Sequence, residues 1–157
     1  MTLFLARAVL GLVLSLNASL VGCGPALQVA FEKVAPIPEG RGMLYIYQDP
    51  LDPYSDRIDI QINGKDVSTL RPRGYFSYVV NPGEVTLAGT KKFSMISGPS
   101  ITLDVKAGQV RYVKLYRDWG RVRSSDDGSK RGWYHLVEIP VLRAEKEIIE
   151  CRLVPVL

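Results

Sequence analysis

Apolar and polar residues alternate in short stretches along the chain from residue 42 onward. In residues 58–62, IDIQI, the isoleucines fall on one face and the polar residues on the other, which is the period of a half-buried strand. Residues 42–48, GMLYIYQ, are apolar at successive positions and predict a strand that is buried on both faces and central in its sheet. Further strands are predicted at residues 65–70, 75–80, 84–88, 101–105, 110–116 and 133–139.

Turn-forming residues separate these stretches. Asn63-Gly64 supplies the two positive φ angles of a type I′ turn, so residues 65–70 are expected to return antiparallel to residues 58–62. Asn81-Pro82-Gly83 and Ala107-Gly108 are also turn sequences. About eight short strands with turn signals every 8 to 12 residues are typical of a sandwich. The pattern therefore predicts a mainly all-β fold, an antiparallel β-sandwich of about seven to eight strands.

The C-terminal part of the chain has a different period. Val141, Ala144 and Ile148 recur at helical spacing directly after Pro140. They predict one short C-terminal helix that closes one end or edge of the sandwich, followed by an extended tail or an edge strand. Cys151 is interpreted as a small buried apolar residue on this helix.

Residues 1–22 do not belong to the predicted core. They form an apolar stretch with Arg7 near its start and small residues at its end, which is typical of a secretory signal. The stretch LVGC, residues 20–23, resembles the lipobox of bacterial lipoprotein precursors, in which an aliphatic residue, a small residue and glycine precede a cysteine. The resemblance implies cleavage between Gly22 and Cys23, attachment of a diacylglycerol to Cys23, and acylation of its new amino group. Two or more acyl chains hold a protein stably on a membrane.

Two other interpretations of this segment stay open. Residues 3–21 come close to the ~20 residues that a helix needs to span a bilayer, so the segment could be an uncleaved helical anchor. In a soluble secreted protein, Cys23 could instead form a disulfide with Cys151. Acylation of Cys23 excludes that disulfide and leaves Cys151 without an intramolecular partner.

The predicted organisation has three parts. Residues 1–22 are a lipoprotein signal peptide, residues 23–40 are the lipidated cysteine and a proline-containing tether, and residues 41–157 are one β-sandwich domain. In lipoproteins of the enterobacterial type, an aspartate directly after the lipidated cysteine retains the protein in the inner membrane. The glycine at position 24 therefore favours the outer membrane, facing the periplasm, if the host is Gram-negative.

Composition and charge fit this picture. The 157 residues are 46% hydrophobic and 23% charged, which is ordinary for a single globular domain. The formal net charge is +4, and the basic residues are spread over predicted turns. This charge favours weak attraction to anionic lipid or lipopolysaccharide headgroups, but it is too small for a nucleic-acid footprint. We expect no nucleic-acid partner.

The sequence contains few residues or motifs that are suited to catalysis. The chain has one histidine, His135, which lies within the predicted strand 133–139 and is expected to be structural. A nucleophilic Cys151–His135 pair is the alternative, provided that the helix and the strand touch. The sequence contains no H-E-x-x-H motif, no paired C-x-x-C and no glycine-rich phosphate loop. We therefore expect no catalytic residue, no cofactor and no enzymatic activity.

One acidic cluster and one loop are the remaining candidate sites. Asp49, Asp52 and Asp56 lie in a proline-rich loop, where they form either a weak calcium site or a solvated turn. Residues 120–132 contain few apolar residues and predict a mobile hairpin loop, bracketed by two tryptophans that could stack on a sugar. The candidate binding surface comprises Trp119, Arg121, Arg123, Lys130 and Arg131.

The order of the segments also resembles a known family. Three segments carry the resemblance, in this order: GMLYIYQ, INGKDVSTLRPRGYFSYVVNPGEVTL and ITLDVKAGQVRYVKL. A valine-rich strand and a short helix that carries Ala144 follow them. This order resembles the bacterial lipoprotein domain known as domain of unknown function 2846. The resemblance covers about residues 42–153 and implies a β-sandwich lipoprotein without assigned chemistry.

The expected role is non-catalytic binding or structural association in the cell envelope. The partners would be the membrane, through the acyl chains, and an envelope protein or glycan. An envelope glycan-binding or lipid-binding module is the alternative function, and a hydrolytic enzyme is the third.

Overall fold

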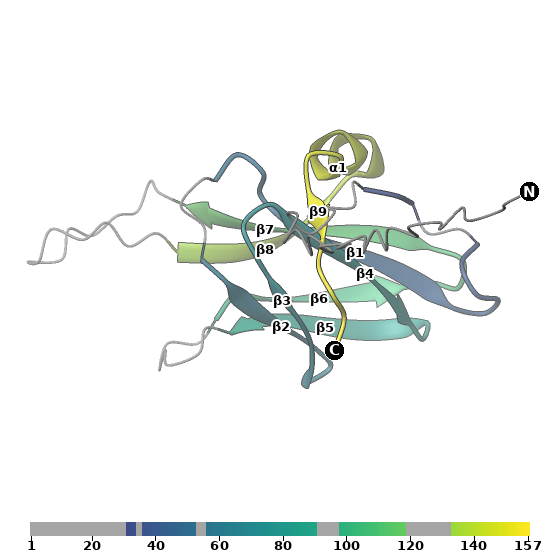
Figure 1. Ribbon diagram of the computed structural model, residues 1–157. Helices are drawn as coiled ribbons and strands as arrows, with labels where there is room; N and C mark the ends of the chain where they lie inside the picture. The colour runs from purple at the N-terminus through teal and green to yellow at the C-terminus, as the bar shows by residue number, and fades with distance from the viewer. Residues whose placement is uncertain (1–30, 34–35, 53–55, 91–97, 119–132) are drawn as a thin grey trace, which may run out of the picture.

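Two β-sheets packed face to face form the body of the protein (Figure 1). The computed structural model describes residues 31–33, 36–52, 56–90, 98–118 and 133–157. The strands in chain order are β1 (Gly42–Gln48), β2 (Ile58–Ile62), β3 (Lys65–Leu70), β4 (Gly74–Val80), β5 (Gly83–Thr90), β6 (Ser100–Val105), β7 (Val110–Asp118), β8 (Trp133–Ile139) and β9 (Arg152–Leu153), with the helix α1 (Val141–Ile148) between β8 and β9.

The strands divide into a five-stranded and a four-stranded sheet. The five-stranded sheet has the order β8-β7-β1-β4-β9, and the four-stranded sheet has the order β3-β2-β5-β6. The predicted all-β sandwich is thus confirmed. Most neighbouring strands are antiparallel, but β1 pairs in parallel with β7 and β4 pairs in parallel with β9. Alternation within a strand does not encode the direction of its neighbour, so the sequence pattern did not predict these two parallel pairs.

The β2–β3 hairpin forms as its turn sequence predicts. Asn63 has φ 50° and Gly64 has φ 76°, the two positive angles that a type I′ turn requires. The Asn63 side chain also accepts a hydrogen bond from the backbone N–H of Thr86, at 2.9 Å, which ties the turn to β5.

The central strand β1 is buried along its whole length, as predicted. Leu44 and Ile46 point between the two sheets, where they join an apolar core that includes Ile60, Phe76 and Leu115. Met43, Tyr45 and Tyr47 point to the outer face of the five-stranded sheet and belong to a second, separate cluster. The five-stranded sheet is therefore buried on both faces.

The helix α1 covers the outer face of the five-stranded sheet, above β7 and β1 (Figure 1). Its Ala144 and Ile148 are fully buried in the outer cluster. This corrects the expectation that the helix closes an end or an edge of the sandwich. Cys151 is buried, as predicted, but it follows the helix instead of lying on it.

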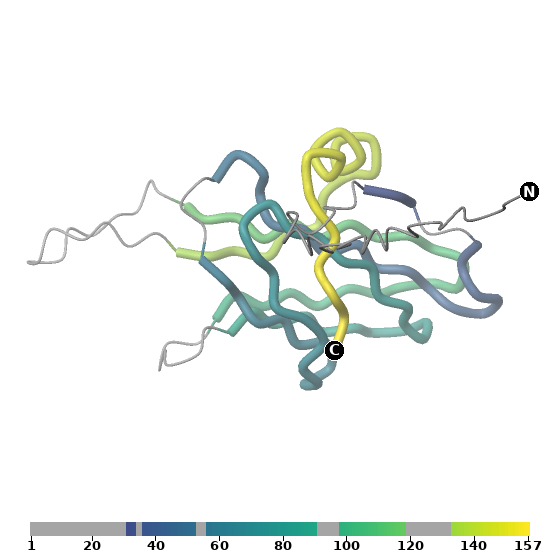
Figure 2. The backbone as a smooth tube through the Cα atoms, in the orientation of Figure 1, coloured from purple at the N-terminus to yellow at the C-terminus, as the bar shows by residue number. Residues whose placement is uncertain are grey.

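The C-terminal segment connects the two layers. After β9 pairs with β4, the chain crosses to the four-stranded sheet, where Val156 bridges Ser68 and the N–H of Leu157 donates to the carbonyl of Val67 (Figure 2). The C-terminal segment, which was expected to be an extended tail or an edge strand, thus forms the short edge strand β9. The residues after β9 connect the five-stranded sheet to the four-stranded sheet.

The segment that precedes β1 also belongs to the folded domain. Phe31 packs edge-on against Tyr45 and Tyr75, and Ile37 packs against the same outer cluster. The domain therefore includes part of the predicted tether, residues 23–40. In the ranges that the structure describes, no helix is long and apolar enough to cross a membrane.

Candidate functional site on the outer face of the five-stranded sheet

A layer of aromatic rings lines the outer face of the five-stranded sheet. Tyr45 of β1 stacks on Tyr112 of β7, with ring centroids 5.1 Å apart and an interplanar angle of 14°. Phe31 meets the rings of Tyr45 and Tyr75 edge-on, at 5.5 Å and 5.2 Å. The parallel register of β1 and β7 pairs Tyr45 directly with Tyr112, so the sheet itself positions this stack.

Glu147 on α1 ties the helix to the sheet through several polar contacts. Its Oε2 accepts a hydrogen bond from the hydroxyl of Tyr47, at 2.8 Å, and lies 3.0 Å from Nζ of Lys114. Its Oε1 accepts from Nε of Arg143, at 2.8 Å, one turn earlier on the helix. Lys114 also contacts the carboxylate of Asp49, at 3.1 Å. The buried ammonium of Lys114 is thus neutralised from two sides.

These contacts shift pKa values in both directions. Burial, followed by the hydrogen bond to Glu147, raises the pKa of the Tyr47 hydroxyl far above its usual range. Burial acts to raise the pKa of Glu147 too, but hydrogen bonds from Arg143, Lys114 and Tyr47 outweigh it, and the net pKa is lowered. Tyr47 is therefore a neutral donor and Glu147 an ionised acceptor over the physiological pH range.

A second, more exposed set of contacts holds residues 31–33 against the helix. Glu145 of α1 accepts a hydrogen bond from the hydroxyl of Tyr112, at 3.2 Å, and pairs with Nζ of Lys33, at 2.9 Å. The hydrogen bond from Lys33 is the main reason that the pKa of Glu145 is lowered. The N–H of Glu32 donates to the hydroxyl of Tyr75, at 3.2 Å. The start of the described chain is thus fixed beside α1.

The three aspartates of the acidic cluster do not share one site. Asp49 pairs with Lys114, whereas Asp52 and Asp56 both lie near Arg117, at 3.9 Å and 3.0 Å. Asp52 is buried, at 6% exposure, so the interpretation as a solvated turn is wrong for this residue. Within the described ranges, no group of three or more histidine, cysteine or acidic residues is placed to hold a metal ion.

Arg117 organises the end of β7 near this cluster. Its guanidinium lies 4.7 Å from the ring centroid of Tyr134, on the neighbouring strand β8, and it donates to the Tyr134 hydroxyl. The backbone N–H of Asp56 also donates to that hydroxyl, at 2.8 Å. The side chain of Gln48, almost fully buried, donates to the carbonyl of Asp56, at 3.0 Å. These contacts anchor the proline-rich loop to the sheet.

The two residues considered for nucleophilic chemistry make separate contacts. The thiol of Cys151 lies 3.6 Å from the carbonyl oxygen of Gln48, and burial raises its pKa to about 12. His135 stacks on Tyr116, its partner across β7 and β8, with ring centroids 5.3 Å apart. The contacts of Cys151 and His135 with described residues are thus those of packed structural side chains.

Several predicted site residues lie outside the described residues. These are Gly22 and Cys23 of the lipobox and the candidate binding surface, Trp119, Arg121, Arg123, Lys130 and Arg131. Trp133, at the other end of the same loop, is described: it opens β8 opposite Asp118 and is 52% exposed.

The sequence pattern did not predict the ion pair between Lys114 and Glu147. The signal for Lys114 is its position: it is a charged residue inside an apolar strand, on the same face as Tyr112 and Tyr116. The signal for Glu147 is weaker, because glutamate is ordinary on an exposed helix face. Only the placement of α1 over the sheet reveals that Glu147 faces Lys114.

The class of protein is thus a two-sheet β-sandwich with one helix packed on its outer face. Residues 38–129, more than half of the chain, match the family described as protein of unknown function DUF2846. The chain belongs to this family, as its segment order indicated. The match ends before β8, earlier than the expected residue 153, so β8, α1 and β9 follow the matched region. No curated protein and no solved structure matches the chain.

Proposed function

We propose that this protein is a lipid-anchored, extracytoplasmic β-sandwich with a non-catalytic binding or structural role in the bacterial cell envelope. The observation that carries the proposal is the lipobox-like LVGC at residues 20–23, placed shortly before a domain whose first described residue is Phe31. Acyl chains on Cys23 would hold this domain at a membrane surface. In a Gram-negative host, Gly24 favours the outer membrane, with the domain in the periplasm.

The state of Cys151 and His135 supports a non-catalytic role. A nucleophilic cysteine needs a lowered pKa and access to substrate, whereas the thiol of Cys151 has a pKa raised to about 12 and is 1% exposed. A histidine base needs to be within hydrogen-bond reach of the nucleophile, whereas His135 stacks on Tyr116.

Membrane fractionation tests the anchor. Wild-type protein expressed in a Gram-negative host should sediment with the membranes, and Cys23→Ser should shift it to the soluble fraction. Cys151→Ser is the matched control, because it removes the other cysteine and should leave the protein in the membrane fraction. If the wild type and the Cys23→Ser protein both stay in the membranes at full length, residues 3–21 act as a helical anchor and the proposal is wrong.

A glycan-binding role is the second candidate function. The observation in its favour is the exposed indole of Trp133, placed by the β7–β8 register opposite Asp118, the residue before Trp119. Exposed aromatic rings of this kind stack on sugar rings. Pulldown of the protein on peptidoglycan and on lipopolysaccharide should decrease for Trp119→Ala and for Trp133→Ala. Unchanged pulldown for both variants would exclude this role for the tryptophan pair.

A further inference from the structure

The helix α1 has a second apolar side that faces away from the sheet. Leu142 is 80% exposed, Ile149 is 61% exposed and Val141 is 45% exposed. Leu142 and Ile149 are two turns apart and lie on the same side of the helix, since Ile149 continues the helical geometry with φ −60° and ψ −22°. The helix thus buries Ala144 and Ile148 against the sheet and presents Leu142 and Ile149 outward.

The N-terminal segment reaches the domain on this same side. Lys33 pairs with Glu145 of α1, and Phe31 packs into the aromatic layer below the helix. Figure 2 shows residues 31–33 beside α1, on the outer side of the five-stranded sheet. Cys23 precedes Phe31 by eight positions, so the chain between them spans at most about 28 Å. A lipid anchor at Cys23 would therefore hold the bilayer close to α1.

We propose that the α1 side of the domain lies against the bilayer surface, with Leu142 and Ile149 in the lipid headgroup region. This orientation rests on the proposed lipidation of Cys23. A short tether keeps the exposed leucine and isoleucine at a high effective concentration near the lipid, so that even a weak apolar contact is populated. Because α1 and residues 31–33 both pack on the outer face of the five-stranded sheet, the lipid anchor lies on the same side of the domain as Leu142 and Ile149.

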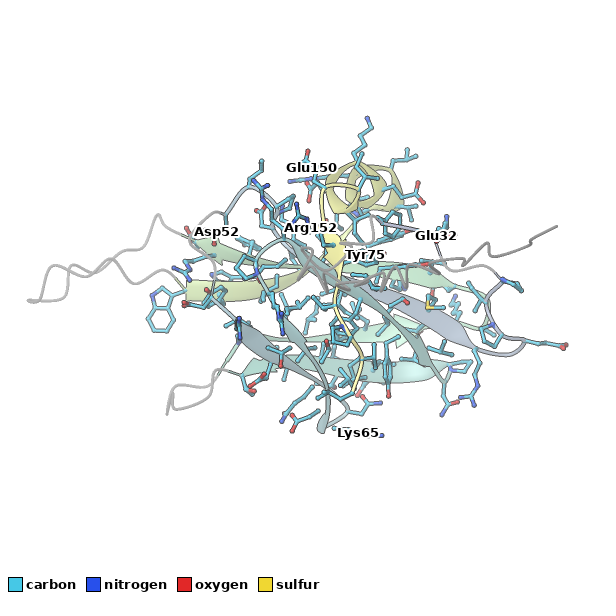
Figure 3. The ribbon with its side chains drawn as sticks, in the orientation of Figure 1. Glu32, Asp52, Lys65, Tyr75, Glu150 and Arg152 are labelled. Atoms are coloured by element: carbon cyan, nitrogen blue, oxygen red, sulfur yellow. The ribbon has the colours of Figure 1, made fainter. Side chains whose placement is uncertain are left out.

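The charges on the helix indicate what drives the contact. Arg143, Glu145 and Lys146 lie on α1 and Glu150 follows it, so this side of the domain carries charges of both signs. Figure 3 places Glu150 and Arg152 beside α1 and Lys65 on the opposite side of the molecule, at the start of β3 in the four-stranded sheet. The contact should therefore depend on apolar insertion and change little when anionic lipids are removed.

Depth-dependent fluorescence quenching tests the orientation. The acylated protein carrying Leu142→Cys is labelled with an environment-sensitive fluorophore and reconstituted into phosphatidylethanolamine–phosphatidylglycerol vesicles that contain a headgroup-level spin-labelled lipid. Lys65→Cys, on the far hairpin, is the matched control, and Lys146→Cys is a second label position that keeps Leu142 and Ile149 intact. Acylation blocks Cys23, and Cys151 is 1% exposed, so labelling is selective.

The expected result is that labels at positions 142 and 146 lose about half of their intensity to the quencher, whereas the label at position 65 loses almost none. Vesicles of phosphatidylcholine alone should give the same contrast. Equal quenching at positions 142, 146 and 65, or stronger quenching at position 65, would overturn the orientation. Failure of the protein to float with the vesicles would show instead that the anchor is absent, and the proposed function would fail with it.

Discussion

The two faces of the five-stranded sheet are both buried, but they are buried by different kinds of contact. The inner face packs aliphatic residues such as Leu44, Ile46 and Leu115 against the four-stranded sheet. The outer face packs tyrosines and a lysine against one short helix, and ionic and hydroxyl contacts connect them. The inner face thus relies mainly on shape and apolar area, whereas the outer face adds a few directional polar contacts to an apolar cluster of its own. A helix held in this way can also present its other side to a partner.

The largest effect is expected from a cavity in the inner face. Phe76→Ala removes a fully buried ring from the core between the sheets and should lower the free energy of unfolding by about 4 kcal/mol. Val79→Ala, on the outer side of the same strand, changes a side chain that is 39% exposed, and should cost less than about 1 kcal/mol. Urea unfolding followed by circular dichroism measures both values. Similar losses for the two variants would contradict the assignment of the faces.

A smaller effect is expected when the helix loses its main polar contact. Glu147→Gln leaves Lys114 with Asp49 as its acidic partner in the network, and should lower the free energy of unfolding by about 2 kcal/mol. This loss is smaller than that expected for a fully buried ion pair, because the Glu147 side chain is 21% exposed. Glu150→Gln, at an exposed position just after α1, is the control and should be close to neutral. Urea unfolding at pH 7 compares the two variants.

The pH dependence of stability should reveal the same contact. Because the folded-state pKa of Glu147 lies below its ordinary value of 4.5, its stabilising contribution is present above pH 4.5 and is lost as the pH falls through the lowered pKa. The wild type should therefore lose more stability on acidification below pH 4.5 than Glu147→Gln loses. Urea titrations at a series of pH values measure the two slopes. Parallel slopes would mean that Glu147 does not contribute through its charge.

The smallest effects are expected from single hydroxyl groups. Tyr47→Phe removes a donor to the partly buried Glu147, and should lower the free energy of unfolding by about 1 kcal/mol. Tyr112→Phe removes a donor to the more exposed Glu145, and should cost less. A larger loss for Tyr112→Phe than for Tyr47→Phe would reverse the proposed order of the two contacts on the outer face.

The sequence predicted the features that depend on neighbouring residues. The bounds of β1 and β8, the type I′ turn at Asn63-Gly64 and the burial of β1 on both faces follow from local periodicity and turn chemistry. The amphipathic period of residues 141–148 likewise predicted α1. Each of these features needs information from only a few consecutive positions.

The remaining features depend on residues that are distant in the chain. The parallel pairing of β1 with β7 places Tyr45 on Tyr112, and the position of α1 brings Glu147 to Lys114. Neither contact produces a periodic pattern in the sequence, because each depends on how the strands and the helix are arranged in the fold. The same is true of Asp52, which a loop sequence presents as solvated but which the fold buries near Arg117.

The mass of the N-terminal peptide of the mature protein tests the central proposal most directly. Protein purified from the membranes of a Gram-negative host is digested with protease, and the first peptide is identified by tandem mass spectrometry. We expect a peptide that begins at Cys23 and carries a diacylglycerol and an amide-linked acyl chain. A peptide that begins at Met1, or one with an unmodified Cys23, would contradict both the lipid anchor and the membrane orientation that depends on it.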